Sequence, residues 1–141
     1  MIKELVSSEE ELSKPSEPAT AEDAQVAQDL YDTVEGLGDE CLCLAANQIG
    51  ELKNIIAFRD EKDDIHVMFN PRIKQAKTPY KTEEGCLSLT DRITKVSRYL
   101  TVKIAFEELV AGELQPRVKQ YDNLVAEGIQ HALDHCRGRL V

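Results

Sequence analysis

The sequence lacks an apolar run of about 18 residues or more, so we expect none of its segments to span a membrane. The segment 1–18 is acidic and has no apolar stretch of the kind found in signal peptides. The four cysteines, Cys41, Cys43, Cys86 and Cys136, form neither a CxxC pair nor the spacing of a disulfide framework. These absences predict a cytoplasmic protein with reduced thiols.

Basic residues are also scarce: 17 Lys and Arg stand against 26 Asp and Glu, which gives a net charge of −9 and a pI near 4.8. Phosphates and anionic lipids repel such a surface, so we expect no direct nucleic-acid partner and no membrane partner. Solubility alone also explains the acidity. The 141 residues, of which 42% are hydrophobic, suffice for one domain over 1–141 with a single modest core.

A helix is predicted over 21–36, where Val26, Leu30 and Val34 recur at helical spacing. Thr20 and Asp23 at its start fit a capping box in which Asp23 replaces the usual Glu or Gln. Residues 1–20 are polar, and we expect them to run along the surface before this helix.

Strand patterns dominate the middle of the chain. They cover 54–58, 65–70, 73–77, 80–86, 94–96, 100–107 and 113–121. The first two are expected to form a hairpin around a polar turn, and a last helix is predicted from Leu124 to about Cys136, ended by Gly138. A helix, then strands, then a helix indicates an α+β fold.

The last predicted helix carries the most informative motif in the chain. His131 and His135, four residues apart, share one face of this helix, which is how a helix offers two imidazoles to one metal ion. In the familiar motif a Glu follows the first His and serves as general acid/base to a metal-bound water. Ala132 holds that position here and cannot exchange a proton. The motif predicts a metallohydrolase site without its proton shuttle, although two His can share a helix face by chance.

Two further segments strengthen the metal hypothesis. Cys86 follows Gly85 at the end of a predicted strand, and a thiolate with two imidazoles makes a three-ligand set. Such a set leaves a fourth position open for water, as catalytic metal sites do. Small residues over 44–50 would let backbone approach a ligand closely, and the Gln48 side-chain NH₂ could donate to a developing oxyanion.

Each of these residues also has an ordinary structural explanation. Cys86 could be a small buried hydrophobe, Gln48 a surface amide, and Asp134 an exposed helix charge. We expect Cys136 to pack at the helix end rather than to act as an extra ligand. His66, in its predicted strand, is expected to be structural or solvent-facing.

The three segments, in this order, resemble the peptide deformylase family. Cys41–Gln48 (CLCLAANQ) matches the family motif G-x-G-L-A-A-x-Q, and Glu84–Ser88 matches E-G-C-L-S in full. Gln130–His135 (QHALDH) matches Q-H-E-x-D-H except at Ala132. The resemblance covers nearly the whole chain. It implies an α+β fold in which antiparallel sheets pack around a C-terminal metal-binding helix, with a further helix near the N-terminus.

The resemblance also implies an activity, the metal-dependent removal of the formyl group from the N-terminal formylmethionine of nascent proteins. By similarity, Cys86, His131 and His135 would ligate one divalent ion. Iron(II) is the family's physiological metal, and zinc, nickel or cobalt can take its place.

Supporting roles follow from the same resemblance. Gln48 and the backbone N–H of Leu87 would hold the formyl oxygen as it becomes an oxyanion. Asp134 would support the metal ligands from behind, and Glu84 and Arg98 would form an ion pair.

The implied partner is an N-formylmethionyl peptide or nascent chain, lying extended along the edges near 42–44 and 84–87. The residues expected to bind it are Leu42, Cys43, Leu44, Glu84, Gly85 and Ile129. Ile129 is expected in the pocket for the Met side chain. A monomer or homodimer, with at most weak association with the ribosome, fits the family.

The chain departs from the family motifs at three positions. Ala132 replaces the catalytic Glu, so this chain is expected to be inactive or strongly impaired. Cys41 and Cys43 replace the two glycines of the first motif and are expected to narrow the pocket. Two explanations of Ala132 stay open: a natural pseudoenzyme that binds formylated or related peptide N-termini, or a deliberate substitution in an active enzyme.

Overall fold

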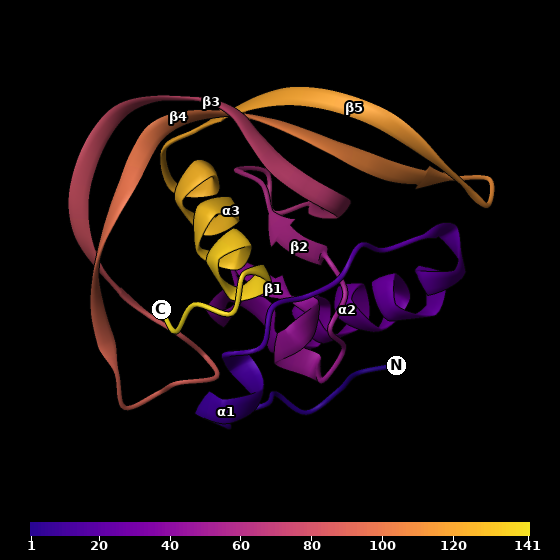
Figure 1. Cartoon of the computed structure of the whole chain (residues 1–141), viewed down its shortest axis with the longest axis horizontal. Coiled ribbons are helices and arrows are strands. Elements are labelled where there is room, and N and C mark those ends of the chain that lie inside the picture. Colours follow the sequence, from indigo (N-terminus) through magenta and orange to yellow (C-terminus); the bar gives the residue numbers. More distant parts are fainter.

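A computed structural model describes all 141 residues as an α+β fold in which a strongly bent antiparallel sheet wraps around the last helix (Figure 1). The helices are α1 (Glu9–Leu12), α2 (Ala24–Leu37) and α3 (Asn123–Cys136). The strands are β1 (Cys43–Ala45), β2 (Ile55–Arg59), β3 (Ile65–Gly85), β4 (Ile93–Val110) and β5 (Glu113–Asp122). Sheet order follows chain order, and every pairing is antiparallel. The predicted fold class is confirmed.

The long strand β3 replaces three of the predicted strands, and β4 likewise joins two. Irregular register between Phe69 and Gln75 lets β3 bend without ending. Because β2 pairs only with Ile65–Phe69 of β3, the rest of β3 has one open edge. A proline on an open edge removes no ladder hydrogen bond, so Pro79 does not interrupt the strand. The bent ribbon carries Gly85 back toward α3.

The N-terminal part of the chain holds one element that the sequence did not predict. Glu9–Leu12 forms a short helix, α1, with Ser8 as its cap, and Leu12 at its end is fully buried. The predicted capping box is confirmed, since the Thr20 N–H donates to Asp23 Oδ2 at 2.9 Å. It starts a short 3₁₀ segment, Ala21–Asp23, that leads into α2.

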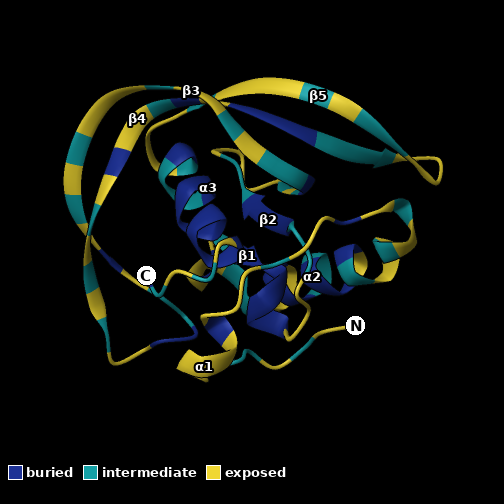
Figure 2. Cartoon of the chain, in the orientation of Figure 1, coloured by how far each residue is buried: buried dark blue, intermediate teal, exposed yellow.

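Two apolar clusters hold the fold together. One joins α3 to the sheet through residues such as Ile129, Leu133 and Phe58. The other joins α2 to β1 and β2 through Leu30, Leu44 and Ile55, among others. Figure 2 shows that α3 is buried over most of its length. A helix enclosed in this way gives its side chains fixed positions.

None of the helices is both long enough and apolar enough to cross a membrane.

Candidate metal centre

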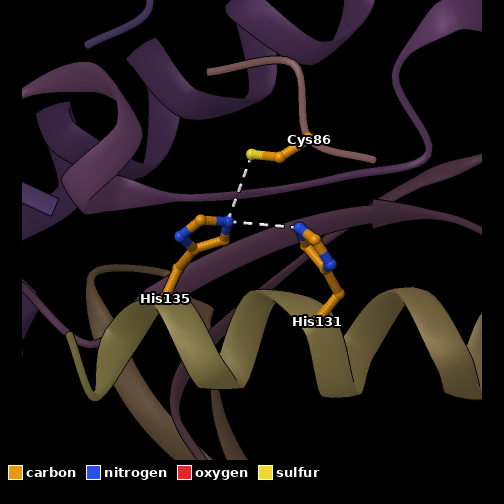
Figure 3. Close-up of side chains that lie close together, drawn as sticks. All are labelled: Cys86, His131 and His135. Atoms are coloured by element: carbon orange, nitrogen blue, oxygen red, sulfur yellow. Dashed lines mark hydrogen bonds between the residues drawn. The ribbon is translucent and has the colours of Figure 1, made fainter. Parts of the chain in front are cut away.

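Three side chains that can hold a metal ion converge beside α3 (Figure 3). His131 and His135 rise from one face of the helix, and Cys86 reaches toward them from the loop after β3. Cys86 Sγ lies 3.4 Å from His135 Nε2, which lies 3.2 Å from His131 Nε2. All three donor atoms lie within 4.8 Å of one another.

These separations fit one tetrahedral ion. Bonds of about 2.0–2.1 Å to nitrogen and about 2.3 Å to sulfur place neighbouring ligand atoms roughly 3.3–3.6 Å apart. The distances of 3.2 Å between the imidazole nitrogens and 3.4 Å between sulfur and nitrogen are close to these values. Thiolate and imidazole are ligands that suit zinc, iron, cobalt and nickel. The donor set therefore fits a single divalent ion with a fourth position for another ligand.

A buried ion network fixes the first imidazole. Glu84 Oε1 accepts a hydrogen bond from His131 Nδ1 at 2.8 Å, which leaves Nε2 to face Cys86 and His135. Arg98 donates to both oxygens of Glu84, at 2.7 and 3.0 Å, and to Asp134 Oδ2 at 2.7 Å. Burial raises the pKa of Glu84, but His131 and Arg98 outweigh it and lower the pKa to about 2. A carboxylate in this position sets the tautomer and raises the basicity of a ligand His.

The network bears on two predictions, the exposure of Asp134 and the ion pair between Glu84 and Arg98. Asp134 is buried rather than an exposed helix charge, and it contacts Arg98 from the side opposite Glu84. The ion pair expected between Glu84 and Arg98 is present, with both side chains buried.

The sulfur of Cys86 is in an environment that favours the thiolate. Burial by itself raises the pKa of Cys86, but hydrogen bonds with His131 and His135 outweigh it and lower the pKa to about 5. Burial lowers the pKa of His131, whereas Cys86 and Glu84 raise it, with a net result of about 9. The two shifts favour a thiolate at Cys86 and a proton on His131. The thiolate is the form of cysteine that binds metals.

The other cysteines differ from Cys86. Burial raises the pKa of Cys41 to about 11 and that of Cys136 to about 12, with smaller opposing contributions from Arg59 and Arg137 respectively. Cys136 is buried in the core cluster that contains α3, as expected from its place at the helix end. His66 is solvent-facing and pairs with Asp60 at 2.7 Å, which agrees with the expectation for that residue.

Gln48 is buried beside the sulfur rather than a surface amide. Its Nε2 donates to Ser88 Oγ at 3.1 Å and lies 3.6 Å from Cys86 Sγ, while its Oε1 accepts from the Ala45 N–H at 2.9 Å. The N–H of Leu87, next to Cys86 in the chain, has no hydrogen-bond partner within the protein. An amide donor and an unpaired backbone N–H thus lie near the three ligand atoms.

Two polar contacts that position the site were not predicted. Asn47 donates from Nδ2 to the carbonyl of His135 at 2.7 Å, which ties the segment after β1 to the end of α3. Gln130 bonds to both the N–H and the carbonyl of Tyr99 at 2.8 Å. Asn47 precedes Gln48 and Gln130 precedes His131 in the family motifs. This position next to a site residue was the one sequence signal that could have identified them.

A cavity of about 280 Å³ opens above the ligand atoms. The residues that line it are Glu40, Leu42, Cys43, Gln48, Glu83, Glu84, Gly85, Cys86, Leu87, Leu124, Glu127, Gly128 and His131. Four of the residues expected to bind substrate are among them. Leu44 and Ile129 are not, because both are fully buried in the core.

Helix geometry explains why Ile129 does not line the cavity. Ile129 is two positions before His131. In a helix with 3.6 residues per turn, two such residues point to nearly opposite sides. Leu124, Glu127 and Gly128 lie seven, four and three positions before His131, so they share its face and line the cavity. The same rule that pairs His131 with His135 would have found them from the sequence.

Ala132 is also fully buried, within the core cluster formed by α3 and the sheet. Its methyl group offers no polar atom to the neighbouring ligand side chains. The only carboxylate bonded to a ligand, Glu84, is held by Arg98 and His131.

A helix that presents two imidazoles to a cysteine, beneath a cavity, defines a class of protein with a candidate mononuclear metal site. The model of the family described as polypeptide deformylase matches residues 2–141. The chain therefore belongs to the polypeptide deformylase family, whose members use a metal ion to remove the N-formyl group from nascent peptides.

Individual relatives agree. The chain is 36% identical over 141 residues to a peptide deformylase of Clostridium beijerinckii, and the match covers all of both chains. It is 34% identical to the Brucella suis enzyme, over 92% of this chain and 74% of the relative. A crystal structure of a Legionella pneumophila peptide deformylase is similar with a TM-score of 0.85 and 27% identity, covering 99% of this chain and 83% of that one.

Proposed function

We propose that this chain is a deformylase scaffold that holds one divalent ion with Cys86, His131 and His135 and binds N-formylmethionyl peptides beside it. The observation that carries the proposal is the convergence of the three ligand atoms within 4.8 Å under a cavity. A bound ion would polarise the formyl carbonyl and lower the pKa of a water molecule. Iron(II) is the ion expected from the family, and the donor set also suits zinc, nickel and cobalt.

Two open strand edges support binding of an extended peptide. β1 pairs only with β2, and the last part of β3, Glu83–Gly85, pairs only with β4. Each segment therefore keeps one edge whose backbone groups can pair with a peptide. Leu42 and Cys43 on one side and Glu84 and Gly85 on the other line the cavity between them.

The formyl oxygen would lie between Gln48 and Leu87. Gln48 Nε2 lies 3.6 Å from Cys86 Sγ, and the Leu87 N–H has no partner in the protein. Both can donate to an oxygen that gains negative charge during hydrolysis. Donors fixed in advance in this way typically contribute a factor on the order of 10²–10³ each.

Hydrolysis by this chain is expected to be strongly impaired. A carboxylate at position 132 would take a proton from water and return one to the leaving amine, and such a group typically contributes about 10²–10⁴-fold. Ala132 cannot do so. Glu84 is not a substitute, because Arg98 and His131 already bind both of its oxygens.

The test is Ala132→Glu, assayed with formyl-Met-Ala-Ser after metal loading. We expect deformylation to rise at least about a hundredfold, since the restored carboxylate supplies the missing proton transfer. Ala132→Gln is the matched control, because it adds similar volume without a base and should give no gain. Full metal occupancy of the Glu variant without a gain in rate would contradict the proposal.

A second candidate, a binding protein without turnover, is favoured because Ala132 supplies no acid/base group while the ligand set and the cavity are present. The protein as it stands would then hold formylated or related peptide N-termini. Calorimetry with the zinc-loaded protein and formyl-Met-Ala-Ser is expected to show saturable binding and intact peptide afterwards. Absence of binding would rule out this candidate.

A further inference from the structure

Glu127 is an unexpected charge in the wall of the substrate cavity. It lies on α3 four residues before His131, which is about 6 Å along the helix axis. It lines the cavity together with Leu124 and Gly128. Tyr80 donates a hydrogen bond from its hydroxyl to Glu127 Oε1 at 2.7 Å, so the carboxylate is held in place by β3.

No Lys, Arg or His side chain forms an ion pair with this carboxylate, and Arg98 acts on it only as a smaller contribution. Glu84, the neighbouring acid, forms ion pairs with Arg98 and His131, whereas Glu127 forms none. The lining of the cavity contains neither Lys nor Arg. Burial raises the pKa of Glu127, Tyr80 opposes this, and Glu84 adds to it. A ligand with a donor or a positive charge would therefore supply what the wall lacks.

We call the part of the cavity next to Glu127 the slot. Leu42 and Leu124, which line the same cavity and are 45% and 62% exposed, offer apolar contact there. Gly128 has no side chain, and a Cβ built there would lie 3.5 Å from Cys43 Cβ, so Cys43 and Gly128 together set its width. A long side chain can pass between the leucines and bring its end to Glu127.

A methionine in this slot would remove water from the carboxylate. The carboxylate would lose its hydrogen bonds to water and gain none from the methionine, which is unfavourable. A lysine has a similarly long aliphatic stem with an ammonium at its end, and that stem can pack on the leucines. Its ammonium would pair with Glu127 where water is partly excluded, so the pair would be stronger than one on the open surface.

We propose that Glu127 is a specificity-determining residue that makes the cavity favour N-formyl peptides whose first side chain ends in a cation or hydrogen-bond donor over those that begin with methionine. The proposal rests on the proposed function for recognition of the formyl group, and it adds the class of side chain that follows. The formyl group is attached to the first residue, so this side chain is the part of the peptide nearest to Glu127.

The experiment measures dissociation constants of the zinc-loaded protein for formyl-Lys-Ala-Ser and formyl-Met-Ala-Ser by calorimetry. We expect the lysyl peptide to bind about five- to tenfold more tightly. Glu127→Met should reverse the preference, and Glu127→Gln, which keeps the shape and an acceptor for Tyr80, should remove most of it. Glu113→Gln changes the same charge at the distant β4–β5 turn and should leave the preference unchanged.

The outcomes separate this proposal from the proposed function. Binding of both peptides with a ratio near one in the unmodified protein and in Glu127→Met would overturn the role of Glu127 and leave formyl-peptide binding intact. A preference for lysine that survives Glu127→Met would overturn it as well. Failure of every variant to bind either peptide would overturn the proposed function and this inference together.

Discussion

The two sides of the candidate metal centre differ in how closely they follow the family motifs. Behind the ligands, Glu84, Arg98 and Asp134 form a buried network that fixes His131. On the open side, Glu127 places a carboxylate without an ion pair in the cavity wall, and Ala132, next to His131 in the chain and buried in the core, supplies no acid/base group. Under the proposed function, holding a metal and transferring protons are therefore tasks of different side chains.

The loss of any one residue from the buried network of Glu84, Arg98 and Asp134 would be energetically costly. A buried charge that loses its partner typically costs about 3–5 kcal/mol, because neither water nor another group replaces it. Arg98 balances two buried carboxylates, so any one member of the network depends on the others. Glu127 on the open side does not carry this cost, because it lines the cavity rather than the buried network.

The largest expected effect comes from breaking the ligand set itself, at the sulfur of Cys86. Cys86→Ser replaces a soft thiolate with a poor ligand, and we expect metal affinity to fall more than about a hundredfold. Elemental analysis after dialysis measures it. Cys43→Ser is the matched control, because Cys43 lines the cavity without belonging to the ligand set, and it should retain the metal. Full occupancy in Cys86→Ser would contradict the ligand assignment.

The next effect tests the network behind the ligands. Arg98→Met leaves Glu84 and Asp134 buried without their common partner, and we expect unfolding free energy to fall by about 3–5 kcal/mol. Urea unfolding measures the change. Arg117→Met removes an exposed pair with Glu108 and should cost less than about 1 kcal/mol. Equal effects of the two variants would argue against a special role for the buried network.

A third prediction uses the ionisation of the metal-free site. The pKa of Cys86 is lowered to about 5, so its thiolate fraction falls only when the pH drops through about 5. Alkylation by iodoacetamide at pH 7 should therefore select Cys86 over Cys41, whose pKa is raised to about 11. Mass spectrometry of the digested protein identifies the site. Zinc should protect Cys86, and equal labelling with and without zinc would count against metal binding by this sulfur.

The smallest expected effect lies on the open side. Cys43→Gly removes the side chain opposite Gly128 and widens the slot, as the glycine of the family motif would. We expect affinity for formyl-Met-Ala-Ser to change by about fivefold or less, since one small side chain contributes roughly 1 kcal/mol or less here. Calorimetry measures this change. A loss of binding by an order of magnitude or more would show that Cys43 does more than set the width.

Much of the site could be predicted because its ligands belong to short motifs. The four-residue spacing of His131 and His135 follows from helix geometry alone, and Cys86 lies next to a strand end that the pattern located. Distances across the fold could not be predicted, because the approach of Cys86 to α3 depends on the bend of β3. The irregular register that allows this bend has no plain sequence signal.

The errors have physical causes of the same kind. The predicted strands 73–77 and 80–86 left out Pro79, whereas β3 runs through it, because an open strand edge tolerates a proline. The helix α1 was missed because four residues are too few for a periodic pattern, and burial of Leu12 stabilises it instead. The expectation that Ile129 binds substrate stays a prediction, although the residue is buried and helical phase places Glu127 in the cavity wall.

The most direct test of the account is X-ray absorption spectroscopy of the zinc-loaded protein at the metal edge. The account predicts one sulfur at about 2.3 Å, two imidazole nitrogens at about 2.0–2.1 Å and one further light ligand. A first shell that contains no sulfur, or a single imidazole only, would contradict the convergence of Cys86, His131 and His135 on one ion.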